Sequence, residues 1–512
     1  MELTYIVLLA LAIVYVPIYV WVRKGPRRAG RYGLRKYGPT IMVETEWGKR
    51  LMDRLAGHTR FWRAFGAVSI ALMFLMMALI VYILAMGALN LPSAFSSPGM
   101  GLEYTLAIPG LNPLLPIWYG LIGLIAAMVI HELAHGFQSR ANGIGVESTG
   151  VLYCVVPLGA FVNPDEKDVE KASRRAKLDL YAAGVSINVI SAAVVFLLFA
   201  VLMLGGISSP YGDNAAVYQV TGDSPASDAG IPTGAIILEV DGERYAYSSD
   251  LGKSYSWSPG DMVSVKYLLE DGEHEAEMRW GLYIERVTSD PAGQAGVERG
   301  SFLISVTDKA SGVKTQIYGY PEFISYMGST RPGMTVALEL MDRGGAVSER
   351  DVTLGSKGDI GFLGIATTTS GMNFRTPAEI LDIARNPLHG ADTPREAATS
   401  MLGYMSGPFN GFSPMPEKVH WWYDAPMGDA FWILLAALYW IFWLNLLLGI
   451  SNALPAFPFD GGFAFLLGLD SALERIGVRD PERRERISGR ISGIVSSAVL
   501  VVFLLITLSV AL

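Results

Sequence analysis

The sequence predicts a polytopic α-helical membrane protein with about six transmembrane helices and an inserted, extracytoplasmic, β-rich region. Of its 512 residues, 51% are hydrophobic, which is high for a water-soluble protein. The apolar residues gather in segments long enough, or nearly so, to cross a hydrocarbon core of about 30 Å. Short β-type runs broken by Gly, Pro and Asp fill the long stretch between the fourth and fifth segments. The predicted spans are Leu3–Trp21, Phe65–Leu89, Leu114–Ser139, Tyr181–Leu204, Phe431–Ile450 and Ile491–Val510.

The first and third of these spans each adjoin polar or charged residues. The first resembles a signal peptide, but it lacks a charged segment before it and a small-residue cleavage site. Because Arg23 and Lys24 follow it directly, we expect a retained anchor. The third span is long enough only if its apolar stretch and the polar turn at residues 131–135 form one helix.

Loop charge predicts the orientation, since cytoplasmic loops are enriched in Lys and Arg. Residues 22–64 carry 12 Lys or Arg against 3 acids, residues 90–113 carry neither Lys nor Arg, and residues 140–180 and 451–490 are again rich in Arg. The β-rich insert carries about 30 acids against 16 bases. These signs alternate along the chain and place the insert and both termini outside. The net charge of −8 gives no support to a nucleic-acid partner.

The insert contains an internal repeat. The segment Val220–Val240 is echoed by Val287–Val306: each has a Ser/Asp-Pro-Ala turn, then Ala-Gly-Ile/Val, a second glycine and an apolar strand. This pattern resembles the central portion of PDZ domains, which bind extended peptide ends at a sheet edge. The copies lie only about 66 residues apart, so we expect two compact or partly fused PDZ-like units. A generic β-rich domain with similar turns is the alternative.

These features divide the chain into six expected parts. They are residues 1–112 (anchor helices and a basic cytoplasmic loop), 113–206 (first half of the membrane core), 207–283 and 284–366 (the PDZ-like units), 367–428 (an outer connector) and 429–512 (second half of the core with a C-terminal helix).

The strongest chemical signal ends the third span, in His131-Glu132-Leu133-Ala134-His135. Two histidines four residues apart share one face of a helix, so both imidazoles can hold one Zn²⁺. The glutamate between them is placed to activate a water on the metal, as in metal-dependent peptide hydrolases. The chain has only six histidines, so a chance match is improbable. The sequence therefore predicts a metal site inside a membrane segment.

A catalytic zinc site needs a third protein ligand. The best candidate is Asp460, which follows the fifth span in a segment whose prolines break the helix. By the charge rule, Asp460 and the histidine motif emerge at the same membrane level, where an unpaired carboxylate is costly. An Asp-Gly-Gly turn is the alternative reading. The only cysteine, Cys154, excludes a disulfide framework, and packing explains it better than a role as nucleophile.

Together these motifs resemble the site-2 protease family of intramembrane zinc metalloproteases. That family pairs HExxH on one transmembrane helix with Asn-x-x-Pro…Asp-Gly on a later one, often with PDZ domains between them. The resemblance covers about residues 117–204, the insert and residues 431–468. HExxH alone is shared with many soluble zinc enzymes, so the specificity lies in the combination. The resemblance implies Glu132 as general base and one Zn²⁺ per chain, held by His131, His135 and Asp460.

Two further family features occur in altered form. The family's β-hairpin-like loop, Pro-x-Gly-Gly-Tyr/Phe-Val, is thought to pair with an unwound substrate. It matches Pro157–Val162, with alanine in place of the second glycine. The resemblance implies that these loop residues bind substrate: Gly159, Ala160, Phe161 and Val162.

The family's Gly-Pro-x-x-Asn appears as Gly184–Asn188, with Val185 in place of proline. The resemblance suggests a catalytic role for Asn188, which would hold the substrate backbone or the oxyanion near zinc. A polar side chain within an apolar helix needs a partner, so an interhelical hydrogen bond is the alternative.

The function implied is regulated intramembrane proteolysis by a zinc-dependent metalloendopeptidase. Its partners would be transmembrane protein substrates, the lipid bilayer, and peptide or C-terminus ligands of the PDZ-like units. We expect a multi-pass plasma-membrane protein with its active site towards the cytoplasm. A catalytically inactive scaffold that binds peptides is the main alternative, but a scaffold has no need of the metal-site residues. A metal transporter would carry further intramembrane carboxylates or histidines, which the predicted spans lack outside the motif.

Overall fold

The computed structural model divides the chain into two compact units. Unit 1 comprises Met1–Leu202, Leu402–Phe412 and Ile433–Leu512, and unit 2 comprises Met203–Met401 and Ser413–Trp432. The structure describes residues 2–89, 91, 109, 112, 115–204, 206–245, 255–386, 388, 390–405 and 417–511.

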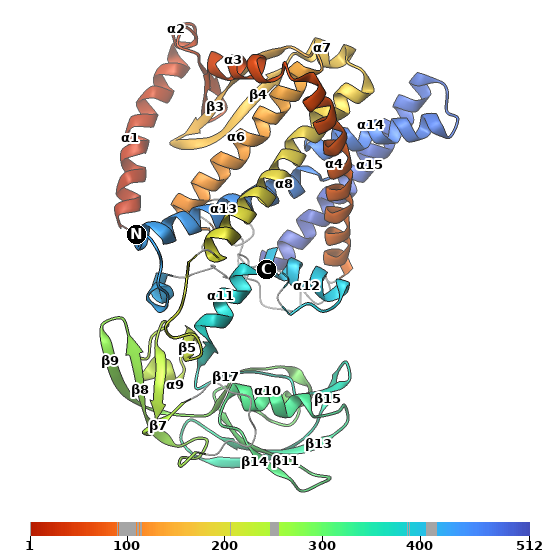
Figure 1. Cartoon of the computed structure of the whole chain (residues 1–512). Helices are drawn as coiled ribbons and strands as arrows, with labels where there is room; N and C mark the ends of the chain where they lie inside the picture. Colours follow the sequence, from red (N-terminus) through yellow and green to blue (C-terminus); the bar gives the residue numbers. More distant parts are fainter. Residues whose placement is uncertain are drawn as a thin grey trace. The chain divides into compact units, whose positions relative to one another are not determined.

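Unit 1 is built on long apolar helices (Figure 1). Among the described residues, five helices are long and apolar enough to cross a membrane: α4 (Thr59–Leu89), α6 (Ile117–Ala141), α8 (Arg174–Leu204), α13 (Asp429–Asn452) and α15 (Pro481–Ala511). They correspond to the second to sixth predicted spans. Helix α6 joins the apolar stretch and the histidine motif in one helix, as the third span required.

The first predicted span lies in α1 (Glu2–Lys24), which is helical as expected. The side chains of residues 2–8 lie outside the described ones, so its membrane crossing stays a prediction. Two tyrosine hydroxyls tie α1 to the turn between the next two strands: Tyr15 donates to the carbonyl of Pro39 (2.5 Å) and Tyr19 to that of Gly38 (2.9 Å). The predicted outer loop at residues 90–113 lies almost wholly outside the described residues.

An antiparallel sheet in the order β1-β2-β3-β4 lies beside these helices. Its strands are β1 (Leu34–Tyr37), β2 (Thr40–Glu44), β3 (Val146–Cys154) and β4 (Val156–Pro164). Strands β3 and β4 form a hairpin, and β4 packs against α6 (Figure 1). In the described part of the chain no strand pairs with the other side of β4. The short helices of this region are α2 (Pro26–Gly30), α3 (Glu46–Leu55) and α7 (Glu166–Lys171).

The chain breaks between α13 and α14 (Asp460–Arg475), as the prolines in this segment predict. Asp460 is the first residue of α14, so the Asp-Gly-Gly sequence begins a helix. Gly461 and Gly462 pack on the backbone of the segment before them. A Cβ on Gly462 would lie 2.7 Å from the carbonyl oxygen of Ala456. The two glycines therefore allow the close approach that fixes where Asp460 lies.

Unit 2 is β-rich, as expected. Within its described residues, twelve strands form one antiparallel sheet in the order β14-β13-β11-β10-β17-β18-β5-β6-β8-β9, with β12 on β11 and β7 on β6. Its strands are β5 (Ala215–Val220), β6 (Ile236–Val240), β7 (Glu243–Arg244), β8 (Met262–Leu269), β9 (Gly272–Arg279), β10 (Leu282–Val287), β11 (Phe302–Asp308), β12 (Lys314–Gln316), β13 (Thr335–Met341), β14 (Val347–Thr353), β17 (Ile365–Thr369) and β18 (Met372–Arg375).

The remaining elements are short. A separate hairpin consists of β15 (Gly355–Lys357) and β16 (Ile360–Phe362). Helix α11 spans Pro377–Arg385. The others are α9 (Pro225–Asp228), η2 (Ser289–Gly293), α10 (Tyr320–Gly328), α12 (Pro394–Met405) and η4 (Glu417–Trp422).

The internal repeat of the sequence recurs in the backbone. Ala226 and Ala292, one in each copy, are fully buried. The amide of Ala226 donates to the carbonyl of Ser370 (3.0 Å), and the amide of Ala292 donates to the carbonyl of Leu363 (3.1 Å). The glycines four residues further on have φ of 76° and 75°, a left-handed conformation that favours glycine. The two copies thus share one local structure.

The sheet also shows how the copies are joined. Strand β17 pairs with β10 of the second copy, whereas β18, later in the chain, pairs with β5 of the first. Met372 and Phe374 of β18 belong to the hydrophobic core of the first copy. The second copy is therefore inserted into the first, which explains their short spacing. The predicted boundaries at 207–283 and 284–366 follow chain order and leave β18 outside. The likeness to PDZ domains stays a prediction.

Candidate metal centre

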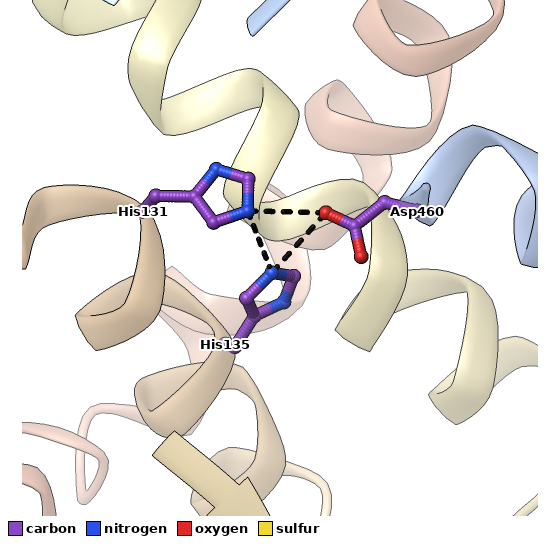
Figure 2. A group of neighbouring side chains, drawn as sticks. All are labelled: His131, His135 and Asp460. Atoms are coloured by element: carbon purple, nitrogen blue, oxygen red, sulfur yellow. Dashed lines mark hydrogen bonds and ion pairs between the residues drawn. The ribbon is translucent and has the colours of Figure 1, made fainter. Parts of the chain in front are cut away.

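His131, His135 and Asp460 converge on one point in unit 1 (Figure 2). The histidines lie one turn apart on α6, and Asp460 begins α14. Their Nε2 atoms are 3.1 Å apart, and each lies 3.2 Å from Oδ2 of Asp460. All three side chains are largely shielded from solvent, with exposed fractions of 8%, 11% and 16%. The structure thus brings together the three residues that the sequence predicted as ligands.

The donor atoms are spaced as a zinc site requires. Ligand atoms about 2.0–2.1 Å from a tetrahedral Zn²⁺ lie roughly 3.3 Å from one another, close to the separations in the triad. Nδ1 of His135 donates to the carbonyl of Leu180 (2.9 Å), so the Nε2 lone pair of the neutral ring faces the centre. Asp460 Oδ2 is buried and has no hydrogen-bond partner among the described residues. Buried acceptors facing one another are costly unless a cation lies between them, so these residues fit a metal ion.

Gly184 on α8 leaves the space that such an ion needs. A Cβ at this position would lie 2.5 Å from Nε2 of His135 and 2.6 Å from Nε2 of His131. Any side chain would therefore fill the centre of the triad. In the sequence, Gly184 stands out only as the first residue of the Gly184–Asn188 motif. A glycine within a long apolar helix was the available signal, since helix interiors disfavour glycine unless packing requires it.

Glu132, between the two histidines, contacts strand β4. Its Oε2 accepts a hydrogen bond from the backbone N–H of Val162 (3.0 Å). The predicted substrate-binding residues lie together on this strand, paired with residues 149–152 of β3; they are Gly159, Ala160, Phe161 and Val162. Gly159 is buried against α6, where a Cβ would lie 2.9 Å from Sδ of Met128. The predicted loop is thus an edge strand held against the motif helix.

Asn188 is fully buried on α8, and its Nδ2 lies 3.3 Å from Nδ1 of His131. Its Oδ1 is buried, and no residue in the described part of the chain forms a hydrogen bond with it. When Nε2 of His131 faces the metal position, Nδ1 carries the proton and needs an acceptor. Turning the amide by half a revolution places Oδ1 there and pairs both groups. This contact favours a role in orienting His131, as the carbonyl of Leu180 orients His135.

We expect Asn188→Ala to lower zinc affinity about 10- to 100-fold, the usual effect of losing a group that orients a ligand. Asn188→Asp, which keeps an oxygen acceptor, should retain more of the affinity. Competition with a chelator of known affinity measures both. Asn445→Ala is the matched control, because Asn445 donates within its own helix to Ile441. Unchanged zinc affinity with slow cleavage in Asn188→Ala would instead support the oxyanion role.

Comparison with known proteins adds the family context. A sequence model described as Peptidase family M50 matches residues 119–499, more than half of the chain. An uncharacterized protein of Methanocaldococcus jannaschii is 26% identical over 239 residues, which cover 45% of this chain and 60% of that protein. A Clostridium perfringens protein, named as a candidate zinc metalloprotease, is 27% identical over 29% of this chain and 50% of its own length.

A plant protein is similar over a comparable stretch. The membrane-bound transcription factor site-2 protease homolog of Arabidopsis thaliana is 27% identical over 155 residues, covering 29% of this chain and 30% of that protein. The chain thus spans between about a third and three fifths of the length of these relatives. His131, His135 and Asp460 all lie within the stretch that the family model matches.

Proposed function

The chain belongs to peptidase family M50, and from this we propose that it is an intramembrane zinc metalloprotease of the site-2 type. Its substrates would be membrane proteins, cut in or near a transmembrane segment. The observation that carries the proposal is the convergence of His131, His135 and Asp460 beside Glu132. The two histidines and the glutamate lie on a helix apolar and long enough to cross a membrane. This arrangement supports one Zn²⁺ per chain.

The chain's own residues divide the chemistry between them. Zn²⁺ at this site would lower the pKa of a water from about 15.7 towards about 7 and polarise the scissile carbonyl. Glu132 takes a proton from the attacking water and passes it to the leaving nitrogen. His135 is held in its ligand tautomer by Leu180, and Asn188 does the same for His131. Gly184 keeps the centre open.

Strand β4 supports a membrane-protein substrate. Transmembrane helices satisfy their backbone hydrogen bonds internally, so a scissile peptide must unwind before attack. An unwound segment needs new partners for its N–H and C=O groups. The outer side of β4 offers them next to the catalytic glutamate, through addition of a strand.

The orientation and the role of unit 2 are part of the same proposal. The basic loops support an orientation with the motif end of α6 at the cytoplasmic side of the plasma membrane and unit 2 outside. The repeated units of unit 2 would bind peptide ends or filter substrates by size. The alternative function is a peptide-binding scaffold without catalysis, which would not use the metal site.

Removal of the metal tests the proposal. The purified protein in detergent should cut a model single-span substrate within its span, as peptide mass measurement will show. A strong chelator should abolish cleavage, and about one equivalent of zinc per chain should restore it. Cleavage that survives full removal of zinc would refute the proposed chemistry. A protein that neither holds zinc nor cuts would favour the scaffold.

A further inference from the structure

We propose that Glu132 closes the free edge of β4 and is released only when a substrate strand takes its place there. This inference rests on the proposed function and concerns how substrate binding activates the catalytic base. It assigns a second partner to a residue otherwise expected to act on water alone. The Glu132–Val162 hydrogen bond carries the argument.

The contact belongs to a longer alignment of β4 along α6. Met128 and Glu132 are four residues apart, so they lie on one face of the helix. Gly159 packs against Met128, and the backbone nitrogen of Val162 donates to Glu132 Oε2 over 3.0 Å. Two successive turns of α6 thus meet two positions of the strand. The carboxylate is held in place by a charge-assisted hydrogen bond, which is stronger than one between neutral groups.

The Glu132–Val162 hydrogen bond lies on the edge of β4 that faces away from β3. Val162 lies opposite Thr149 of β3, yet its N–H points away from β3 to Glu132. In an antiparallel ladder, backbone groups two residues apart point to the same side. The N–H and C=O of Ala160 therefore face outward with those of Val162. These are the groups to which an added strand would pair, and Glu132 already occupies one of them.

A substrate strand must therefore exchange with the carboxylate. A substrate carbonyl oxygen accepts the Val162 N–H, and Glu132 Oε2 becomes free to act on water. The N–H stays paired before and after the exchange, which avoids the cost of an unpaired buried donor. The exchange makes release of the base depend on strand formation at β4. A helical, unopened substrate would leave Glu132 bound to the strand.

A double-mutant cycle tests the exchange without turnover. The probe is the fluorescently labelled single-span substrate of the cleavage assay, and its affinity in detergent is read from anisotropy. Both Glu132 variants remove the catalytic base, so the probe stays intact. Glu132→Gln keeps an oxygen for the Val162 N–H, whereas Glu132→Ala has none. We expect Glu132→Ala to bind the probe about three- to tenfold more tightly than Glu132→Gln.

The second pair of variants removes the N–H itself. Val162→Pro lacks this donor, and an edge strand tolerates proline where the N–H points away from the sheet. In this background, Glu132→Gln and Glu132→Ala should bind the probe with equal affinity. With Val162→Ala, which keeps the N–H, the difference should remain. Each variant should hold about one zinc per chain, which confirms that the site is intact.

Two results would overturn the inference while the proposed function stands. One is equal affinity of Glu132→Gln and Glu132→Ala for the probe in a protein whose wild type holds zinc and cuts. The other is an affinity gain of the same size in the Val162→Pro background, which would assign the effect to the smaller side chain of alanine and not to the Val162 N–H. A wild type that neither holds zinc nor cuts would overturn the proposed function itself.

Discussion

Gly184→Ala is expected to abolish both zinc binding and cleavage. The new methyl carbon would lie 2.5–2.6 Å from the Nε2 atoms of His135 and His131, in the space that the ion needs. Both imidazoles are held from behind, by Leu180 and Asn188, and cannot withdraw without losing these contacts. Zinc content should fall from about one per chain to almost none, and elemental analysis of the purified protein measures it.

Two comparisons distinguish loss of zinc at the site from a general weakening of the fold. Alanine favours a helix over glycine by about 1 kcal/mol, so α8 itself should not be weakened by the change. Gly489→Ala on α15 is the matched control, because a Cβ there meets no atom of a described residue within 4 Å. It should keep zinc and activity. If Gly184→Ala kept its zinc, the metal would have to lie away from the point where the three ligands converge.

Glu132→Gln is expected to separate metal binding from catalysis. Glu132 is not one of the three residues whose ligand atoms converge, so the variant should keep about one zinc per chain. Glutamine has nearly the same shape and retains an oxygen for Val162, but it cannot take a proton from water. Loss of a general base costs about 10²- to 10⁴-fold in rate. Cleavage of the single-span substrate, followed over time on gels, measures the loss.

A surface glutamate is the control for this variant. Glu166 begins α7 and is exposed, so Glu166→Gln should cut at the wild-type rate. Loss of zinc together with activity in Glu132→Gln would mean that Glu132 helps to hold the metal. Cleavage at the wild-type rate would remove Glu132 from the mechanism. Together, Gly184→Ala and Glu132→Gln distinguish a site without zinc from a site that holds zinc but lacks the general base.

Much of the site could be predicted because its strongest signal is local. Two histidines four residues apart share a helical face wherever the helix lies, so His131 and His135 required no tertiary information. Asp460 required more: the charge of the loops placed it at the level of the motif, and the prolines before it predicted a break. The structure confirms that these residues converge. The β-rich insert and its repeat were also visible, since turns and alternating strands depend on neighbouring residues.

Other features depended on how the elements pack. Gly184 matters because α8 passes within contact distance of both imidazoles, and the spacing of residues along α8 says nothing about that distance. The hydrogen bond between Glu132 and Val162 joins a helix to a strand thirty residues away. The pairing of β18 with β5 places one repeat inside the other, against chain order. Such contacts depend on the packing of whole elements.

The sequence therefore predicted the five spans that the described helices match, the repeat, and the three residues that converge beside Glu132, because periodicity and composition act over a few residues. What surrounds these residues depends on how whole elements pack: the open space at Gly184, the hydrogen-bond partners of the histidines, and the strand that contacts Glu132. The two kinds of feature differ in how far apart along the chain the contributing residues lie. A ligand type is a property of one side chain, whereas the space and the hydrogen-bond partners around it come from segments far apart in the chain.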